Sequence, residues 1–465
     1  MTAAPPLRQI LRERPRFFVA IFLAFWVSYL VHFNPAATGS DRFVLLALSL
    51  VDQHTLRIDA YKDATNELAS TGGHYYLNTN PGMSYLALPA VALSRLVPLG
   101  TATGPGTLPF FAAHFAGFAT TTAVAGALTC VLLAALLLQW TGSSRWALLA
   151  AAVYGFGSIS FFFSTRLQQN VVIAFFALLV WAMLRERPEE PGRGTLLAIG
   201  FLLGLGLFID LSIVPLGLAV LVALLWERRF TALVPLALGA IAPVACLALY
   251  QWLAFGDPLA PAQAYIPRQG TVLDHGLLGL TLPSPARLLP QILSLDCGLL
   301  VFMPWTVLAL LPLRRGAGEP RVLSPREARL VGSMVLFYLL WVSVLPSFRF
   351  CLFGPRYLMP FLPPLAGLAL LRLSSWPRLG AATLAAGFLV NLAGAQIGIP
   401  TDNVIRTVVV WVMRGPWLPV VPWIQTNLPE GPRIVTPYGL LLLWVVALAA
   451  IYLWGRAAAR EDGRA

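Results

Sequence analysis

Charged residues are scarce in this chain of 465 residues. They make up 11% of the sequence, whereas a soluble domain carries about 25%. Hydrophobic residues reach 58%, and the mean hydropathy is +0.75. A chain with so few charges and such long apolar runs belongs in a bilayer. The composition therefore excludes a soluble protein and predicts an all-α, polytopic integral membrane protein.

The sequence also has few residues of the types that bind metals, and no nucleotide-binding motif. Its 4 cysteines form no C-x-x-C pair, its 5 histidines lie in no H-E-x-x-H motif, and no glycine-rich phosphate loop is present. Cys130 and Cys246 lie inside apolar runs, where cysteine behaves as a small buried hydrophobe. No internal repeat stands out, which argues against a transporter built from inverted repeats. The motifs therefore predict no metal site.

The apolar runs predict about 12 membrane-spanning helices. No polar stretch is long enough to form a separate soluble domain, so residues 1–465 are expected to form a single transmembrane domain. The expected spans are 17–33, 109–139, 146–163, 168–184, 195–209, 211–226, 231–255, 289–313, 330–346, 357–371, 379–397 and 437–454.

The arginines predict how the chain is oriented in the membrane. Four of them, at positions 8, 12, 14 and 16, precede the first span, and most of the 32 Lys and Arg residues fall in the alternate segments that follow on the same side. Cytoplasmic segments carry this excess of positive charge. Both termini are therefore expected in the cytoplasm, and segments 34–97, 256–288 and 398–436 are expected to be extracytoplasmic loops.

The first of these loops is the main polar interruption of the chain. It is rich in acidic residues, and Asp41–Asp52 has the pattern of an amphipathic helix lying along the membrane surface. Gly72-Gly73 predicts a turn. Met83–Val97 is apolar but short for a span, so an interfacial or re-entrant helix is expected there.

Carboxylates in this loop are the candidate catalytic groups. A base that activates a hydroxyl must be reachable by substrate at the membrane edge, and Asp41 has that position, although Gly-Ser-Asp before an apolar run is equally good N-cap chemistry. Asp59, Asp63 and Glu67 are spaced by four residues, so a helix would carry them on one face, either as a solvated face or as a site. His74 has no partner at metal spacing, which favours a structural hydrogen bond.

Cations near the same face are the candidate phosphate contacts. Arg166 and Arg356 are expected at short extracytoplasmic turns, where an arginine serves either as a phosphate ligand or as an ordinary interfacial anchor. Asp210 interrupts the apolar run 201–226. It is either a functional carboxylate within the membrane or part of a tight turn between two spans.

Several motifs, in order along the chain, resemble those of the GT-C superfamily of membrane glycosyltransferases. The similarity is to the bacterial branch akin to protein O-mannosyltransferases and aminoarabinose transferases. The matching segments are SLVDQHTLRIDAY at 49–61, GHYYLNTNPGMS at 73–84, YQWLAFGDP at 250–258, GLLVFMPW at 298–305 and FGPRYLMP at 353–360. One departure stands out, because relatives carry Asp-Lys where this chain has Asn78-Thr79.

The resemblance implies a glycosyltransferase of the bacterial inner membrane. Such enzymes move a hexosyl or pentosyl group from a polyprenyl-phosphate donor to an extracytoplasmic acceptor hydroxyl with inversion. Asp41 is then expected to be the general base, with Asp59 as the second choice. No cofactor is required by the sequence, although a divalent metal is compatible with it. The candidate substrate contacts are Asp63, Glu67, His74, Tyr75, Asn78, Asn80, Arg166 and Arg356.

Two other readings remain open. A transporter or flippase of lipid-linked sugar would need charged residues along a path through the mid-membrane, and the spans are nearly free of acidic residues. A catalytically inactive GT-C relative is also compatible with the change to Asn78-Thr79. Nucleic acid is not an expected partner, since the net charge of +12 follows from the cytoplasmic arginines.

Overall fold

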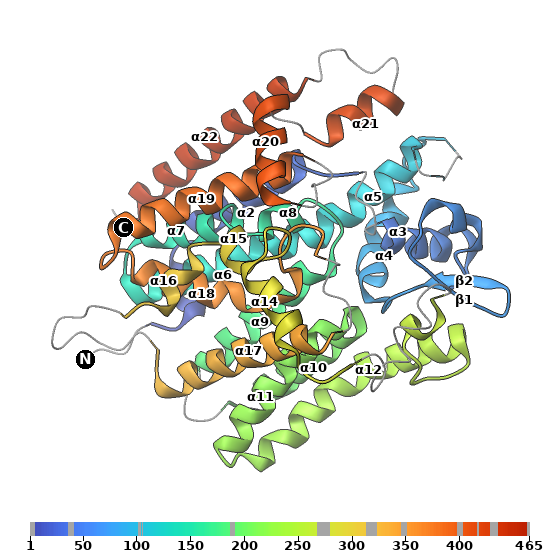
Figure 1. Cartoon of the computed structure of the whole chain (residues 1–465), viewed down its shortest axis with the longest axis horizontal. Helices are drawn as coiled ribbons and strands as arrows, with labels where there is room; N and C mark the ends of the chain where they lie inside the picture. Colours follow the sequence, from blue (N-terminus) through green and yellow to red (C-terminus); the bar gives the residue numbers. More distant parts are fainter. Residues whose placement is uncertain are drawn as a thin grey trace.

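The computed structural model is an assembly of helices with one small β-hairpin (Figure 1). It describes residues 5–35, 41–100, 104, 106–186, 191–266, 280–312, 323–345, 351–397, 403–415, 418–427 and 436–462; side-chain description excludes Asp41 and residues 456–462. The predicted loops 256–288 and 398–436 are therefore described only in part. The all-α, polytopic prediction is confirmed, while the exact number of spans stays a prediction.

The helices follow the apolar runs of the sequence. The α-helices are α1 Leu7–Glu13, α2 Pro15–Val31, α3 Asp41–Leu48, α4 Gly82–Ser94, α5 Leu108–Thr120, α6 Thr122–Thr141, α7 Ser144–Gly155, α8 Ser160–Phe163, α9 Gln169–Arg185, α10 Arg193–Ile209, α11 Val214–Trp226, α12 Leu233–Phe255, α14 Pro285–Leu293, α15 Leu299–Phe302, α16 Thr306–Leu310, α17 Pro325–Val344, α18 Leu362–Leu371, α19 Pro377–Gln396, α20 Val404–Arg414, α21 Val420–Asn427 and α22 Pro437–Asp462.

Shorter elements connect these helices. The π-helix η1 spans Ser49–Gln53, and the 3-10 helices are η2 Asp59–Ala64, η3 Leu211–Ile213, η4 Phe230–Ala232, η5 Ala262–Tyr265 and η6 Arg356–Phe361. Strands β1 (Leu68–Thr71) and β2 (His74–Leu77) pair antiparallel, with Thr71 opposite His74. Gly72 and Gly73 both have positive φ, as the predicted tight turn requires.

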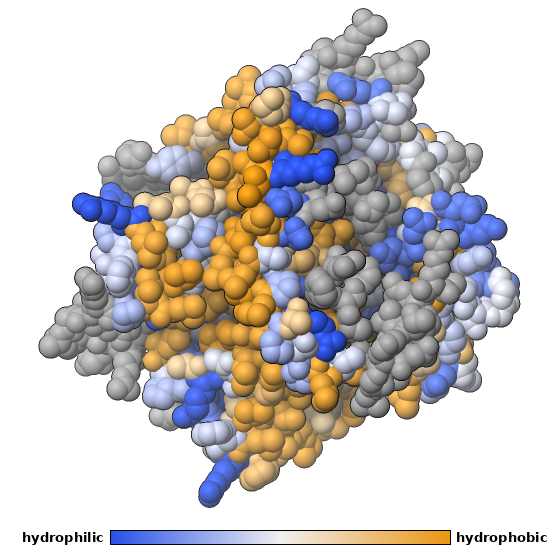
Figure 2. Space-filling view, in the orientation of Figure 1, coloured by the Kyte–Doolittle hydropathy of each residue, from blue (hydrophilic) through white to orange (hydrophobic). Residues whose placement is uncertain are grey.

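Five helical segments of the described chain are long and apolar enough to cross a membrane, or six if the bent pair α1–α2 counts as one span. They are Leu108–Thr141, Phe230–Phe255, Pro325–Val344, Pro377–Gln396 and Pro437–Gly455. Five further apolar helices have 10–17 residues. Apolar side chains form a broad band across the face shown in Figure 2, and polar side chains gather toward the edge where the hairpin lies.

Two predicted spans are broken. The run 289–313 forms the end of α14, then α15 and α16, instead of one helix. The breaks lie before α15, where Gly298 is the N-cap, and at Pro304, which has no N–H for a helical hydrogen bond. The run 146–163 divides into α7 and α8 after Gly155. Both expectations of a single continuous span were wrong.

The segment predicted to be an interfacial amphipathic helix is buried instead. Every residue from Phe43 to Leu48 in α3 has 0% exposure, so protein covers the helix on all sides and not on one face only. The amphipathic pattern did not reveal this, because Arg42, which resembles part of a polar face, is itself buried at 8% exposure. The short helix predicted over 83–97 is present as α4.

Segments predicted to share the cytoplasmic side do lie together. The predicted cytoplasmic ends are joined by polar contacts between Arg8 and Glu186, Arg14 and Ser144, Arg185 and Glu327, and Arg326 and Glu227. The C-terminal end of α22 lies at the end of the molecule away from the hairpin (Figure 1). On the opposite side, η5 of the second predicted extracytoplasmic loop contacts β1 of the first.

A disulfide joins Cys297, which precedes α15, to Cys351, which precedes η6. The expectation that Cys246 is buried was wrong, since it is exposed on α12, whereas Cys130 is buried as predicted.

Candidate active site

The first loop brings an arginine, a glutamate and an asparagine together. Arg42 Nη1, near the start of α3, donates to Glu67 Oε2 in a short ion pair and to Asn78 Oδ1 at 3.4 Å. Asn78 Nδ2 donates to the same Glu67 oxygen at 2.8 Å. Glu67 directly precedes β1 and Asn78 directly follows β2. The hairpin register therefore places Glu67 beside Asn78, and Arg42 bridges both.

Arg356 is a second cation whose charge contributes to lowering the pKa of Glu67. Partial burial acts to raise the pKa of Glu67, but Arg42, Asn78 and Arg356 outweigh it and lower that pKa. Arg356 Nη2 donates to Tyr357 Oη at 3.3 Å, while its Nε is buried with no hydrogen-bond partner among the described residues. Two guanidinium groups therefore act on one carboxylate.

Asp59 and His74 form a separate pair on the hairpin. Asp59 Oδ2 lies 2.8 Å from His74 Nδ1, and Asp59 Oδ1 accepts the backbone N–H of Tyr75 at 2.6 Å. Burial acts to raise the pKa of Asp59, but the Tyr75 and His74 hydrogen bonds and the charges of His74 and Arg57 lower it overall. Both side chains are about two-fifths exposed, at 40% and 38%. Asp59 thus fastens η2 to β2, and the hydrogen-bonded role expected for His74 is confirmed.

The predicted helix carrying Asp59, Asp63 and Glu67 on one face does not form. The 3-10 helix η2 ends at Ala64, and Thr65 is extended (φ −150°, ψ 150°), because the chain turns there into the hairpin. Asp63 stays exposed on η2, while Glu67 reaches the arginine cluster. Of the three carboxylates, only Glu67 joins the cations.

The turn after β2 is locked onto the end of α10. Asn80 Nδ2 donates to the carbonyl of Leu207 at 2.6 Å, and a Cβ on Gly82 would lie 2.7 Å from the carbonyl oxygen of Phe208. Only glycine permits that close approach. The side chain of Asn80 is therefore used to hold the loop, and the prediction that it binds substrate has no support from its contacts.

A second polar group lies where α9, η3 and α17 meet. Gln169 Nε2 donates to Asp210 Oδ2 at 3.1 Å, and the other Asp210 oxygen accepts the backbone N–H of Ser212 at 2.8 Å. Asp210 forms a turn between α10 and α11, as one of the two expectations stated. Gln169 Oε1, Ser212 Oγ and Tyr338 Oη are buried with no partner among the described residues.

Arg166 is buried in an aromatic environment. Its guanidinium lies 3.5 Å from the centroid of the Phe162 ring, and its Nε donates to the Phe162 carbonyl at 3.1 Å. Phe162 stacks on Phe353, with centroids 4.6 Å apart, three residues before Arg356. Arg166 Nη2 has no partner among the described residues. This arginine is a buried neighbour of the site, not an interfacial anchor.

Asp41, the first choice for the base, directly precedes Arg42 at the start of α3. Its side chain lies outside the described residues, so its role stays a prediction. Within the described ranges, no three His, Cys, Asp or Glu side chains lie close enough to hold a metal ion. The metal requirement also stays a prediction.

The fold is similar to the crystal structure of ArnT from Cupriavidus metallidurans bound to undecaprenyl phosphate, with a TM-score of 0.52. The alignment covers 95% of this chain and 77% of that chain, at 18% sequence identity. This chain shares the fold of that ArnT structure. ArnT is a GT-C aminoarabinose transferase, so the resemblance seen in the motifs is confirmed at the level of fold. The apo ArnT structure aligns with 16% identity and a TM-score of 0.47, over 95% of this chain and 76% of that chain.

No protein-family model matches the sequence, and no curated protein sequence matches it either.

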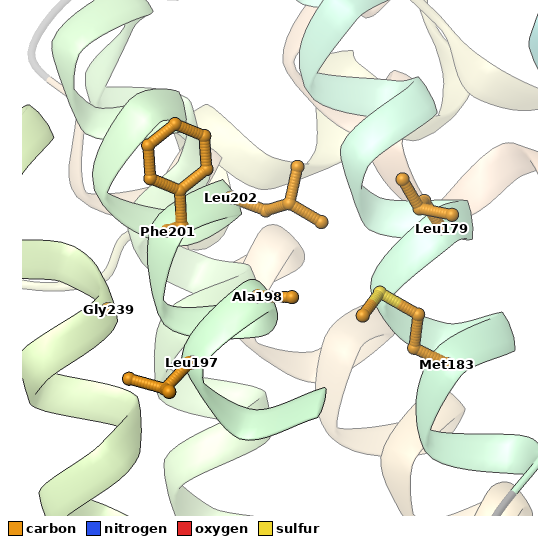
Figure 3. A pocket seen from close by; sticks show the side chains of 7 residues that line it. All are labelled: Leu179, Met183, Leu197, Ala198, Phe201, Leu202 and Gly239. Atoms are coloured by element: carbon orange, nitrogen blue, oxygen red, sulfur yellow. The ribbon is translucent and has the colours of Figure 1, made fainter. Parts of the chain in front are cut away.

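An apolar groove opens on the surface of the helices. It has a volume of about 540 Å³ and lies between α9, α10 and α12 (Figure 3). Leu179 and Met183 of α9 lie about 15 and 21 Å along that helix from Gln169, at about 1.5 Å per residue. The groove offers no charged group and suits a hydrocarbon chain. Its lining residues are Leu179, Met183, Leu197, Ala198, Phe201, Leu202 and Gly239.

Proposed function

We propose that this protein is a membrane glycosyltransferase that moves a sugar from a polyprenyl-phosphate donor to an acceptor hydroxyl outside the cytoplasm. The observation that carries the proposal is the similarity in fold to the ArnT structure. Two arginines support it: Arg42, which is paired with Glu67 of the first loop, and Arg356, whose charge lowers the pKa of Glu67. The solved ArnT binds undecaprenyl phosphate, and a related lipid donor is the substrate class we assign here.

The proposed reaction inverts the anomeric carbon. The acceptor hydroxyl attacks that carbon, its bond to the phosphate oxygen breaks, and polyprenyl phosphate leaves with the electron pair. A loop carboxylate takes the hydroxyl proton, and arginine stabilises the charge that develops on the leaving phosphate. The transferred group is a hexosyl or pentosyl sugar.

Asp41 is the proposed base. Asp59 remains the second choice, because both of its oxygens already accept hydrogen bonds and its lowered pKa makes it a weaker base. Glu67 is also less suited, because its ion pair with Arg42 stabilises the carboxylate and lowers its pKa, which makes it a weaker base. The base therefore comes from the residue adjoining the arginine cluster in the chain.

The proposed setting is the bacterial inner membrane, with both termini in the cytoplasm. The disulfide between Cys297 and Cys351 supports an oxidising environment on the side of the candidate site. The excess of arginine in the opposite segments supports the same orientation.

The test uses purified protein in nanodiscs with a panel of labelled polyprenyl-phosphate sugars, following release of polyprenyl phosphate. We expect turnover with at least one donor, loss of turnover in Asp41→Asn, and a ten- to hundredfold lower kcat/KM in Arg356→Gln, as for a lost charge-assisted hydrogen bond. Arg406→Gln, an exposed arginine on α20, and Asp257→Asn, an exposed loop aspartate, serve as matched controls.

Turnover that is unaffected by Asp41→Asn but abolished by Asp59→Asn would move the base to Asp59. No turnover with any donor, accompanied by movement of a lipid-linked sugar across the bilayer, would overturn the enzyme and favour the transporter.

A further inference from the structure

Three polar residues meet at the turn between α10 and α11. Gln169, the first residue of α9, donates from Nε2 to Asp210 Oδ2 at 3.1 Å, and the backbone N–H of Ser212 donates to Asp210 Oδ1 at 2.8 Å. Gln169 is 3% exposed and Ser212 is 1% exposed, whereas Asp210 is partly exposed. The two hydrogen bonds therefore hold an amide and a serine beside one carboxylate that a ligand can reach.

Two of these residues have hydrogen-bonding atoms that the protein does not use. Gln169 Oε1 and Ser212 Oγ are buried with no partner in the part of the chain that the structure describes. A carboxylate oxygen such as Asp210 Oδ2 also accepts more than one hydrogen bond. Burying a polar atom without a partner is unfavourable. A polar ligand that satisfies these atoms would therefore bind favourably at this turn.

The Asp210 turn lies against the first loop. Asn80 Nδ2 donates to the carbonyl of Leu207, three residues before Asp210, at 2.6 Å. A Cβ on Gly82 would lie 2.8 Å from Ile209 Cα, directly before Asp210. In addition, α9 contacts η6, which carries one of the candidate phosphate contacts. The three polar residues therefore adjoin both the first loop and the segment that begins at Arg356.

We propose that Gln169, Asp210 and Ser212 bind the hydroxyl groups of the sugar that the lipid donor carries. The inference rests on the proposed function, which it deepens by naming residues that hold the transferred group. In a polyprenyl-phosphate sugar the ring is bonded directly to the phosphate, so a sugar site has to adjoin the candidate phosphate contacts.

The hydrogen-bonding chemistry of the three residues matches that of a sugar. The Gln169 and Asp210 oxygens accept hydrogen bonds from O–H groups, and the Ser212 hydroxyl donates to a neighbouring oxygen. Adjacent hydroxyls on a sugar ring supply both the donors and the acceptor oxygen, whereas a hydrocarbon chain supplies neither. A buried water would satisfy the same atoms, but it would affect ligands with and without a sugar alike.

The test compares lipids that differ only in the sugar. Binding is measured on the full-length protein in phosphatidylcholine nanodiscs, with undecaprenyl phosphate and with undecaprenyl phosphates carrying glucose, mannose, galactose or arabinose as probes. We expect wild type to bind at least one sugar-bearing lipid more tightly than undecaprenyl phosphate. We expect Ser212→Ala to weaken binding of that lipid about three- to tenfold, and to leave binding of undecaprenyl phosphate unchanged.

Asp210→Asn changes the chemistry of the site while keeping the hydrogen bonds of the turn. The asparagine oxygen still accepts the Ser212 N–H, and its nitrogen replaces Oδ2, so the Gln169 amide turns its own oxygen toward that nitrogen. Gln169 then presents N–H donors to the ligand, and the site loses the acceptors at Oδ2 and Oε1. We expect binding of the sugar-bearing lipid to weaken about ten- to hundredfold, and binding of undecaprenyl phosphate to stay at the wild-type level.

Ser343→Ala is the matched control for Ser212→Ala. Ser343 is also a buried serine, but its hydroxyl donates to the Leu340 carbonyl within α17. This control is expected to bind every lipid as wild type does. Equal affinity of wild type for all five lipids would overturn the proposal. It would also be overturned if the two site variants bound all lipids as wild type does, or lost affinity for undecaprenyl phosphate as much as for the sugar-bearing lipid.

Failure of the proposed function looks different. Sugar-dependent binding that both site variants weaken, in a protein that turns over no donor, would sustain the sugar site and overturn the transferase. Turnover with a wild-type KM for the donor in both site variants would sustain the transferase and overturn the sugar site.

Discussion

Gly200 on α10 has no room for a side chain. A Cβ placed there would lie 1.9 Å from the carbonyl oxygen of Leu236 on α12, far inside an ordinary van der Waals contact. Gly204, one turn further along α10, and Gly239 on α12 are similarly close to the opposing backbone, at 2.8 and 2.1 Å. Small residues at this spacing let membrane helices approach closely. Gly200→Ala must therefore push two backbones apart.

The expected cost of Gly200→Ala is about 1–3 kcal/mol of unfolding free energy, the usual range for overpacking a tight contact. Gly194 provides the matched control, because it lies on the same helix and a Cβ there meets nothing within 4 Å. Gly194→Ala is expected to be neutral or to stabilise by up to about 1 kcal/mol, since alanine favours a helix more than glycine does.

The assay is unfolding of purified protein in mixed micelles with increasing SDS, followed by tryptophan fluorescence, with the two variants compared against wild type. Gly200→Ala is expected to unfold at a lower SDS fraction, and Gly194→Ala at the same fraction or a higher one. Equal midpoints for Gly200→Ala and wild type would refute the close approach of α10 and α12.

Two further predictions concern covalent and acid-sensitive contacts. Replacing both Cys297 and Cys351 by Ala opens a loop with a sequence separation of 54 residues. The loss of the disulfide would cost about 4 kcal/mol of unfolding free energy for a free chain, and less for a chain held in a bilayer. The midpoint of thermal unfolding is therefore expected to fall, whereas Cys246→Ala is expected to leave it unchanged; an unchanged midpoint in the double variant would contradict the prediction. The lowered pKa of Asp59 means that its stabilisation of the hairpin is complete above the ordinary aspartate pKa and is lost as the pH falls through the lower, folded value. Hydrogen exchange at the Tyr75 amide is therefore expected to accelerate at acid pH in the wild type, beyond its intrinsic pH dependence, and not in Asp59→Asn. Identical pH profiles of exchange for the wild type and Asp59→Asn would argue against the prediction.

The sequence predicted the helices better than their interruptions. Long apolar runs such as α12 and α22 need no tertiary information, because a bilayer demands about 20 apolar residues in a row. The three short helices at 285–310 were missed, although Gly298 and Pro304 mark the breaks between them. Such residues also occur inside intact helices, as Pro243 does in α12, so whether a proline breaks a helix depends on the neighbouring helices that satisfy the freed carbonyls.

The candidate site was predicted only in its parts. Glu67 and Asn78 were each named, but their contact depends on the register of a hairpin that an i, i+4 helical spacing concealed. The flanking residues held a usable signal, since a Gly-Gly pair between two short apolar strands is typical of a hairpin. Arg42 was missed because it resembles the polar face of a surface helix, and its burial is set by tertiary packing.

The distribution of the cysteines suits this protein for site-directed labelling. Two of the four are consumed by the disulfide and Cys130 is buried, which leaves Cys246 on the outer face of α12 as the exposed thiol. Cys246 lies within a helix apolar enough to cross a membrane, where a water-soluble maleimide has poor access. Single cysteines introduced into the polar loops would therefore be labelled from solution against a low background, without first removing native residues. The native chain is thus a ready starting point for mapping which loops face which side of the bilayer.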